Sequence, residues 1–325
     1  MSEAENGQFV VSLDFELFWG VRDHASLDDY RSRLQGTREV IPALLDLFAS
    51  YDIHATWATV GFLFADGRQE VNEYIPSTRP RYERSKFSPY AHLETTGASE
   101  REDPYHYAPS LIDRIAEVPG QEIGSHTFSH YFCMEVGQSR QAWRADLVAA
   151  RDIAREKDAQ LESLVFPRNQ YRSAYLQDCR ELGFRCFRGK PDRWMYRPRR
   201  RGRERLIRRA ARLLDAHLPL AGKLSQEIGC ERGLRDVVGS RFLRPWTPKS
   251  APFAGWRRRR IRREISHAAR EGETYHLWWH PHNFGLHSDR NLSFLRSILD
   301  HFAKERDRRD MRSVNMREAA SRERR

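Results

Sequence analysis

Short apolar segments typical of β-strands alternate with segments of helical periodicity along most of this 325-residue chain. Predicted strands lie at 8–19, 54–64, 122–124, 161–167, 184–187 and 274–279, and predicted helices at 37–52, 111–118, 139–157, 174–182 and 291–304. Strands that alternate with helices form parallel sheets or barrels. The order therefore predicts one α/β domain over residues 1–325. In such folds, chemically active side chains gather at the carboxyl ends of the strands.

Three stretches interrupt the alternation. Residues 72–109 are polar and rich in proline, which predicts a long functional loop region. Residues 197–263 form an Arg-rich insertion, and residues 306–325 form a basic C-terminal tail that we expect to be frayed.

The composition predicts a cytoplasmic protein. No run of 18 apolar residues occurs that could cross a membrane, and the N-terminal residues are acidic where a signal peptide would be basic. Cys133, Cys179, Cys186 and Cys230 show no CxxC spacing, which is typical of reduced, scattered thiols.

The net charge of +11 is concentrated in one segment. Residues 197–263 hold 21 Lys and Arg against 5 Asp and Glu, a balance of +16. Within this insertion, residues 201–224 can form a helix with leucines on one side and arginines on the other, which is typical of helices that lie on an anionic membrane. We therefore expect peripheral contact with the inner membrane face. Binding to nucleic acid or an anionic glycan is less favoured, and a merely solvated insertion stays open. The sequence does not indicate an oligomeric state.

Polar residues follow the predicted strands. Asp14 and Glu16 in LDFE are two positions apart, so both side chains point to one face of a strand. His126 and His130 in HTFSH are one helical turn apart, a spacing that allows two imidazoles to reach one ion. Each pair taken alone is as typical of an ordinary protein surface as of a metal site. Together, two histidines and one carboxylate would make a three-ligand site with an open position, as in catalytic metal sites.

Two further strand ends carry titratable or cationic groups. Arg168 in VFPRN can hold a carboxylate ionised by two parallel hydrogen bonds, or can form an ordinary surface ion pair. His280 and His282 in WWHPH follow an apolar strand, where a histidine can act as a general acid or simply be part of the core.

As a set, these motifs resemble those of the polysaccharide deacetylases, the NodB-homology group of carbohydrate esterases. GSHTFSH is similar to the family's metal motif, and VVSLDFE to its aspartate-bearing first motif. VFPRNQYR resembles the arginine motif, Asp192-Arg193-Trp194 the aspartate–tryptophan motif, and LWWHPH the closing histidine motif. The five motifs occur in the family's order and span Val10 to Gly285.

The resemblance implies a deformed, incomplete (β/α) barrel that hydrolyses an N-acetyl group with the help of a divalent metal. It implies that Asp14 is the catalytic base, held ionised by Arg168, and that His126 and His130 are metal ligands. The first motif departs from the family's pattern of two adjacent aspartates, because Phe15 takes the place of the second. Glu16 is the natural substitute ligand, with Asp14 as the alternative.

The resemblance also assigns roles to the remaining motif residues. It implies that His280 protonates the leaving amine, with His282 as its rival and Asp192 as the group that orients whichever serves. Trp19, Asn169 and Trp194 are expected to contact substrate. Trp278 and Trp279 are further candidates for the sugar-binding cleft, although these tryptophans are as readily core residues. Zn²⁺ suits the ligands best, and Mn²⁺, Co²⁺ or Ni²⁺ fit similar donors.

The expected function is a cytoplasmic N-deacetylase acting on an amino sugar in a surface polysaccharide or lipopolysaccharide precursor. One alternative is hydrolysis of another small amide or of a nucleotide-linked sugar. Another is a non-catalytic barrel that binds a glycan or an anion.

Overall fold

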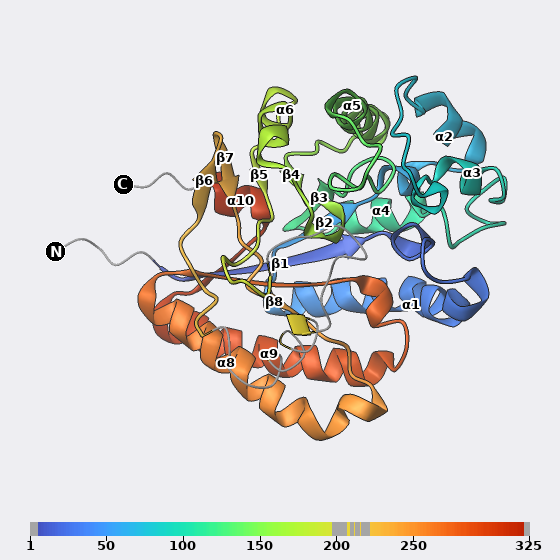
Figure 1. The fold of residues 1–325 in the computed structure, drawn as a ribbon. Coiled ribbons are helices and arrows are strands. Elements are labelled where there is room, and N and C mark those ends of the chain that lie inside the picture. The colour runs from blue at the N-terminus through green and yellow to red at the C-terminus, as the bar shows by residue number, and fades with distance from the viewer. Residues whose placement is uncertain (1–5, 197–206, 209–210, 212–214, 216–221, 322–325) are drawn as a thin grey trace.

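The computed structural model describes residues 6–196, 207–208, 211, 215 and 222–321. Within these residues, one sheet has the strand order β6-β7-β5-β4-β3-β2-β1-β9-β8, and β10 also pairs with β1. The strands are β1 Gln8–Phe15, β2 Ala55–Thr59, β3 Gln121–Ser125, β4 Ser163–Leu164, β5 Cys186–Phe187, β6 Gly229–Glu231, β7 Leu234–Asp236, β8 Arg241–Phe242, β9 Thr274–Trp279 and β10 Arg312–Val314. The described path has β6 and β8 as its two ends, so the curled sheet is an open half-barrel, as predicted (Figure 1).

The pairings are parallel throughout, except between β6 and β7. β1 lies near the centre, and all eight of its residues are buried. This explains its nearly continuous apolar sequence, because a parallel strand covered on both faces has no solvent side. The predicted α/β class is confirmed.

Helices cover both sides of this sheet. They are α1 Leu27–Tyr51, α2 Arg68–Tyr74, α3 Tyr90–Leu93, α4 Pro109–Ala116, α5 Arg140–Glu156, α6 Leu176–Glu181, α8 Ala254–Glu271, α9 Ser288–Arg309 and α10 Met316–Ser321. In the view of Figure 1, α1, α8 and α9 lie below β1, and α4, α5 and α6 lie above it. Among the described helices, none is long and apolar enough to span a bilayer.

Helix α1 begins ten residues before the predicted start at Thr37. Ser26 is the N-cap and accepts a hydrogen bond from the amide of Asp29, whereas Thr37 lies inside the helix and donates to the Arg33 carbonyl. Gly36 lies inside this helix, one residue before the predicted start. A Cβ there would lie 2.0 Å from the Gly285 carbonyl oxygen, so the glycine permits close packing instead of ending the helix.

The stretch 72–109 is more regular than predicted. It contains the end of α2, a 3-10 turn at Ser85–Phe87, α3 and the start of α4. Tyr82 and Phe87 pack against Phe132, and Leu93 is fully buried in the main core. These apolar anchors make the segment a folded cover, which the local richness in proline and polar residues concealed.

The prediction of a frayed C-terminal tail is wrong for the described part. Helix α9 continues to Arg309, and β10 then pairs in parallel with residues 8–10 of β1. Strand β2 pairs only with residues 11–15 of β1, which leaves the edge that β10 occupies. Met316 of α10 is buried beside it.

The predicted amphipathic helix at 201–224 lies mostly outside the described residues. The rest of the basic insertion supplies β6, β7, β8 and the first half of α8. Helix α8 packs beside α9, where Arg262 donates two hydrogen bonds to the Ser297 carbonyl.

Candidate active site

Carboxylates and imidazoles meet at the carboxyl ends of β1, β3 and β9. Asp14 is the penultimate residue of β1 and Glu16 directly follows the strand, while His126 follows β3 and His280 follows β9. Because these strands are parallel neighbours or next neighbours in the sheet, their carboxyl ends share one edge. The segments are far apart in sequence, and only the fold brings them together.

Glu16 is the centre of the cluster. Its Oε2 lies 3.3 Å from His126 Nε2 and 3.1 Å from His130 Nε2, and its Oε1 lies 3.5 Å from His280 Nε2. The 3-10 helix Leu17–Gly20 folds back over this carboxylate, and a Cβ at Gly20 would lie 1.9 Å from Glu16 Cδ. A glycine at position 20 therefore makes room for the buried glutamate.

The histidine motif forms an irregular turn in the connection that follows β3. Thr127 and His130 both have positive φ, 67° and 56°, which curls the chain back so that the two imidazole rings lie 5.2 Å apart. Such left-handed conformations cost about 1–3 kcal/mol each for residues other than glycine. The hydroxyl of Thr127 accepts a hydrogen bond from the Tyr131 amide, and this contact helps to hold the turn.

The cluster fits a divalent metal. Glu16, His126 and His130 are buried and offer three ligand atoms within 4.8 Å of one another. Within the described part of the chain, neither ring nitrogen of His126 makes a hydrogen bond, although both are buried. Buried polar atoms without a partner are costly, and a metal ion would satisfy them. A second trio, Glu16 with His280 and His282, meets the same distance criterion.

Asp14 is held by Arg188. The guanidinium donates to both carboxylate oxygens, at 2.6 and 2.8 Å, and both residues are buried. Ser12 and Asn169 accept further hydrogen bonds from the guanidinium, which also lies over the Trp278 ring at 4.1 Å. Burial acts to raise the pKa of Asp14, but Arg188 and the nearby imidazoles outweigh it and hold that pKa below its ordinary value. Asp14 is therefore a carboxylate at neutral pH.

The comparisons with known proteins agree with this geometry. The family model described as polysaccharide deacetylase matches residues 27–187, a segment that includes both histidines of the metal motif. The chain belongs to the polysaccharide deacetylase family. The match ends one residue before Arg188 and does not include β1 or β9, so it does not cover the carboxylates or the closing histidines.

Several solved structures share the fold at low sequence identity. A putative polysaccharide deacetylase from Mycobacterium smegmatis is 14% identical, with 98% of this chain and 91% of that chain covered at a TM-score of 0.61. A probable polysaccharide deacetylase from Pseudomonas aeruginosa PAO1 is 12% identical, with 96% of this chain and 88% of that chain covered at a TM-score of 0.52. Puue allantoinase is 13% identical, with 96% of this chain and 88% of that chain covered at a TM-score of 0.54. No curated protein matches the chain.

The prediction that Arg168, the arginine of the family's third motif, holds Asp14 is wrong. Arg168 instead pairs with Asp23, lies 3.7 Å from Glu135, and stacks on the Phe132 ring at 3.8 Å. The backbone of Arg168 is left-handed, with φ of 56°, within the 3-10 turn Pro167–Asn169, which directs its side chain to these partners.

Arg188 had a signal in the sequence, because it directly follows the predicted strand 184–187. Asn169, expected to contact substrate, instead accepts two hydrogen bonds from Arg188 and is mostly buried. Both arginines therefore support carboxylates, but only Arg188 reaches the predicted base.

The two closing histidines differ in exposure. Their rings stack at 5.1 Å, yet the side chain of His280 is 24% exposed and that of His282 only 6%. His280 Nε2 lies 3.6 Å from Asp14 Oδ2, and its Nδ1 lies 3.3 Å from the Asn283 amide nitrogen. Burial lowers the pKa of His282 to about 3. Asp192 is exposed and is not among the described ion-pair partners of either histidine, in contrast to the predicted orienting role.

The tryptophans divide between the core and the site. Trp19 is 1% exposed and donates to the His106 carbonyl, and Trp279 packs between Phe48 and Phe284, so neither lines a cleft. Trp278 does border the site, through Arg188 and His280. Trp194 is 51% exposed.

Asp146 on α5 holds the histidine turn, and sequence reasoning did not identify it. Its carboxylate accepts a hydrogen bond from the Phe128 amide at 2.9 Å and another from the Ser129 hydroxyl. Asp146 is fully buried, and burial raises its pKa to about 7. It contacts neither metal-ligand histidine, so we assign it a positioning role.

We expect Asp146→Ala to weaken metal binding about 10–100-fold, the range found when groups that orient ligands are removed. The Phe128 amide and the Ser129 hydroxyl would lose their acceptor, so the strained turn would no longer be fixed. Calorimetric titration with Zn²⁺ measures the affinity, and Asp152→Ala on an exposed part of the same helix is the control. Equal affinities in the two variants would contradict the positioning role.

Proposed function

We propose that this protein is a metal-dependent hydrolase that removes an N-acetyl group from an amino sugar. The observation that carries the proposal is the convergence of His126 and His130 on one oxygen of Glu16, beside the Asp14–Arg188 pair. These groups are the parts that amide hydrolysis at a metal needs: ligands, a proton acceptor and a nearby proton donor.

Glu16, His126 and His130 would hold the metal. Two imidazole nitrogens and one carboxylate oxygen suit Zn²⁺, and Mn²⁺, Co²⁺ or Ni²⁺ accept similar donors. When bound, such an ion polarises the acetyl carbonyl and lowers the pKa of a water molecule. The carboxylate ligand is thus Glu16, and Asp14 is left for another role.

Asp14 is the proposed proton acceptor. Because Arg188 holds both of its oxygens, the carboxylate stays ionised and keeps a fixed orientation despite being buried. A proton taken from the attacking water would reside on this carboxylate.

His280 is the proposed proton donor to the departing amine. An amide nitrogen leaves poorly unless it is protonated, so the donor must reach the substrate. The partly exposed His280 lies 3.6 Å from Asp14, whereas His282 is enclosed behind it. We therefore assign the donor role to His280 and a supporting role to His282.

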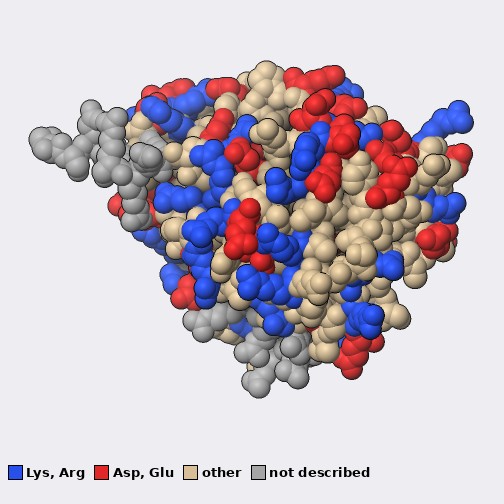
Figure 2. Space-filling view, turned by 90° about the horizontal axis from the view of Figure 1, so that it is seen from above, with Lys and Arg blue, Asp and Glu red and all other residues tan. Residues whose placement is uncertain are grey.

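The proposed substrate is a precursor of a surface polysaccharide or lipopolysaccharide, met in the cytoplasm at the inner membrane face. Support comes from the Arg-rich segment 197–263, which holds 21 Lys and Arg against 5 Asp and Glu; Figure 2 shows one face of the molecule, on which many lysine and arginine side chains lie with acidic side chains among them. In addition, Phe253 and Trp256 at the start of the Arg-rich α8 are 43% and 62% exposed, with their rings 6.3 Å apart. Exposed aromatic rings among arginines favour an anionic membrane surface.

The alternatives use the same site differently. The fold shared with an allantoinase leaves hydrolysis of a small amide or a nucleotide-linked sugar as the second candidate. A non-catalytic glycan-binding or anion-binding barrel is disfavoured, because such a module has no use for a buried carboxylate kept ionised beside a partly exposed histidine.

Acetate release tests the proposal. Metal-free protein reloaded with Zn²⁺ is incubated with N-acetylglucosamine, with its 1-phosphate and with its nucleoside-diphosphate derivative. We expect His126→Gln to lose both metal and activity, and His280→Gln to keep the metal while activity falls about 100-fold or more. The control is His267→Gln, which changes a half-buried histidine of α8 that is not part of either trio around Glu16.

The opposite pattern is equally informative. If His280→Gln loses the metal and His126→Gln keeps it, the ion belongs to the second trio around Glu16 and the proposed donor is wrong. A loaded enzyme that releases acetate from none of these compounds would contradict the amino-sugar assignment.

A further inference from the structure

The two carboxylate oxygens of Glu16 face two different pairs of histidines. Oε2 lies 3.3 Å from His126 Nε2 and 3.1 Å from His130 Nε2. Oε1 lies 3.5 Å from His280 Nε2 and 4.0 Å from His282 Nδ1. The rings within each pair are equally close, with centroids 5.2 and 5.1 Å apart. One carboxylate therefore stands between two sets of imidazole donors.

The second pair has the donors and the spacing of a metal site of its own. Glu16, His280 and His282 offer three ligand atoms that lie within 4.8 Å of one another. Atoms that bind one tetrahedral Zn²⁺ at about 2.0–2.2 Å lie roughly 3.3–3.6 Å from one another. The 3.5 Å from Glu16 Oε1 to His280 falls in this range, and the 4.0 Å to His282 lies just above it. A small shift of one ring would therefore complete the coordination.

A buried atom of His282 lacks a partner at this place. The side chain is only 6% exposed, and among the residues that the structure describes its Nδ1 has no hydrogen-bond partner. A buried polar atom without a partner is costly. The same nitrogen is the one that lies 4.0 Å from Glu16 Oε1, so an ion between the two atoms would satisfy it.

His280 can bind an ion through Nε2 and keep a partner for its other nitrogen. A histidine that binds a metal through Nε2 carries its proton on Nδ1 and donates it to a neighbouring acceptor. The side-chain amide nitrogen of Asn283 lies 3.3 Å from Nδ1, and half a turn of the amide group puts its oxygen there as an acceptor. Since His280 is partly exposed, the second trio is also open to ions from solvent.

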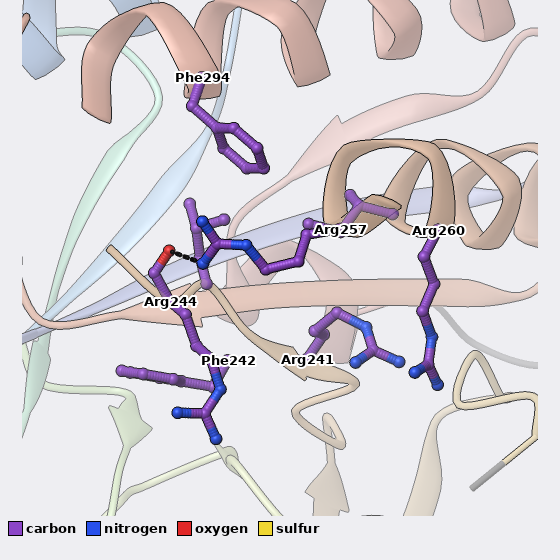
Figure 3. A pocket seen from close by; sticks show the side chains of 8 residues that line it. Arg241, Phe242, Arg244, Arg257, Arg260 and Phe294 are labelled. Carbon is purple, nitrogen blue, oxygen red and sulfur yellow. Dashed lines mark hydrogen bonds between the residues drawn. The ribbon is translucent and has the colours of Figure 1, made fainter. Parts of the chain in front are cut away.

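Aromatic rings border His280, and the arginines of α8 do not face it. The rings of Phe242 and Trp278 lie 5.6 and 6.0 Å from the imidazole. In Figure 3 the ring of Phe242 extends away from Arg241 and Arg260. Both of these guanidinium groups pair with a carboxylate of α8. Their charges are therefore directed away from the second trio and do not exclude a cation there.

We propose that Glu16, His280 and His282 form a second metal site, which takes a divalent ion while the first trio holds the catalytic one. Glu16 then bridges the two ions, one through each oxygen. In two-metal sites the ions lie about 3.5–4 Å apart, a separation that one carboxylate spans. The second ion inhibits hydrolysis, because an imidazole whose Nε2 binds a metal has no proton there for the departing amine. The site stands on the geometry, and its inhibitory effect rests on the proposed function.

The second ion should bind more weakly than the first. Two divalent cations repel each other, and of the two carboxylates nearby, Asp14 is already paired with Arg188. The charge of Arg33 also acts on His282 and opposes a second cation. We expect an affinity at least about 10-fold lower than that of the first site. One equivalent of Zn²⁺ would then fill only the first trio, and an excess would fill both.

Calorimetric titration of the metal-free, full-length protein with Zn²⁺ counts the ions. We expect two equivalents in the native protein and one, at the tighter site, in His282→Gln. The control is His287→Asn, which changes an exposed histidine in the same connection after β9 and introduces a residue that tolerates its left-handed backbone. This control should keep both equivalents.

Manganese tests whether the two ions are neighbours. Unpaired electrons on ions about 3.5–4 Å apart couple, so the electron paramagnetic resonance signal per Mn²⁺ should fall when the second equivalent is added. The native protein should show this loss of signal, and His282→Gln should not. The measurement on the native chain holds even if the variant does not fold.

Acetate release at rising Zn²⁺ measures the inhibition. Relative to its own rate at one equivalent, the native protein should lose about 10-fold or more of its activity as the second site fills. The same ratio should stay constant in His282→Gln. Each protein is compared with itself, so a lower basal rate in the variant does not affect the result.

The outcomes separate the second site from the hydrolase assignment. A single equivalent in the native protein overturns the second site, as does a second equivalent that His282→Gln retains. A second equivalent lost in His287→Asn belongs to the surface and also overturns it. Two neighbouring ions in a protein that releases acetate from none of the compounds support the site and contradict the proposed function. Full activity with both sites filled overturns the inhibitory role.

Discussion

Glu16→Gln should abolish tight metal binding and reduce acetate release by at least about 100-fold. The substitution keeps the size of the side chain but removes the charge on which His126 and His130 converge. Oε1 of the same carboxylate lies 3.5 Å from His280. Glu16 is the residue shared by the two described trios, one with His126 and His130 and the other with His280 and His282. Elemental analysis of the purified variant and calorimetric titration with Zn²⁺ measure the effect.

The control for this experiment is Glu181→Gln, which changes an exposed ion pair with Arg144. It should bind the metal as the native protein does. If Glu16→Gln retains full metal content, Asp14 is the carboxylate ligand and Glu16 has only a structural role. Asp14→Asn then becomes the variant that loses the ion.

Arg188→Met should both destabilise the protein and inactivate it. Removing one partner of a buried ion pair leaves the other charge without compensation, at a cost of about 3–5 kcal/mol. Asp14 would lose two hydrogen bonds, at 2.6 and 2.8 Å, and with them its fixed orientation. We expect acetate release to fall about 100-fold or more, as for loss of a general base. Urea unfolding gives the stability change.

A double-mutant cycle identifies the cause of this instability. Asp14→Asn combined with Arg188→Met removes both charges. The double variant should therefore lose clearly less free energy of unfolding than the sum of the losses in the two single variants. Arg168→Met is the matched arginine control, since it releases Asp23 and Glu135 but leaves Asp14 engaged. Greater loss of activity in Arg168→Met than in Arg188→Met would contradict the assignment made from the structure.

The main features of the fold could be predicted because strand patterns are local. β9 matches its predicted range of 274–279, and the α5 prediction differs from the observed helix by one residue at each end. The edge strand β10 could not be found in this way. Its three residues carry little apolar pattern, and its partner on β1 is at the other end of the sequence.

The site could be predicted as a set of residue types at strand ends, but not as a set of contacts. The spacing of His126 and His130 indicated that both imidazoles could reach one ion, but the contact itself depends on two left-handed residues that bring the rings together in a turn. The choice between Arg168 and Arg188 depended on a backbone φ of 56° at Arg168, which no periodicity indicates. Asp146 was missed because its role comes from the packing of α5 against the histidine turn, 18 residues earlier in the chain, and no local periodicity indicates that contact.

The pairing of β10 with β1 has a consequence for biosynthesis. Gln8 and Arg312 are register partners, and β9 pairs with β1 on its other side. The strand that carries Asp14 is therefore synthesised early, whereas two of the strands that pair with it are synthesised late. Asp14 and Glu16 are thus translated long before the segments of β9 and β10. A nascent chain stalled before residue 274 would have neither neighbour, and the enzyme can acquire its active geometry only after nearly complete translation.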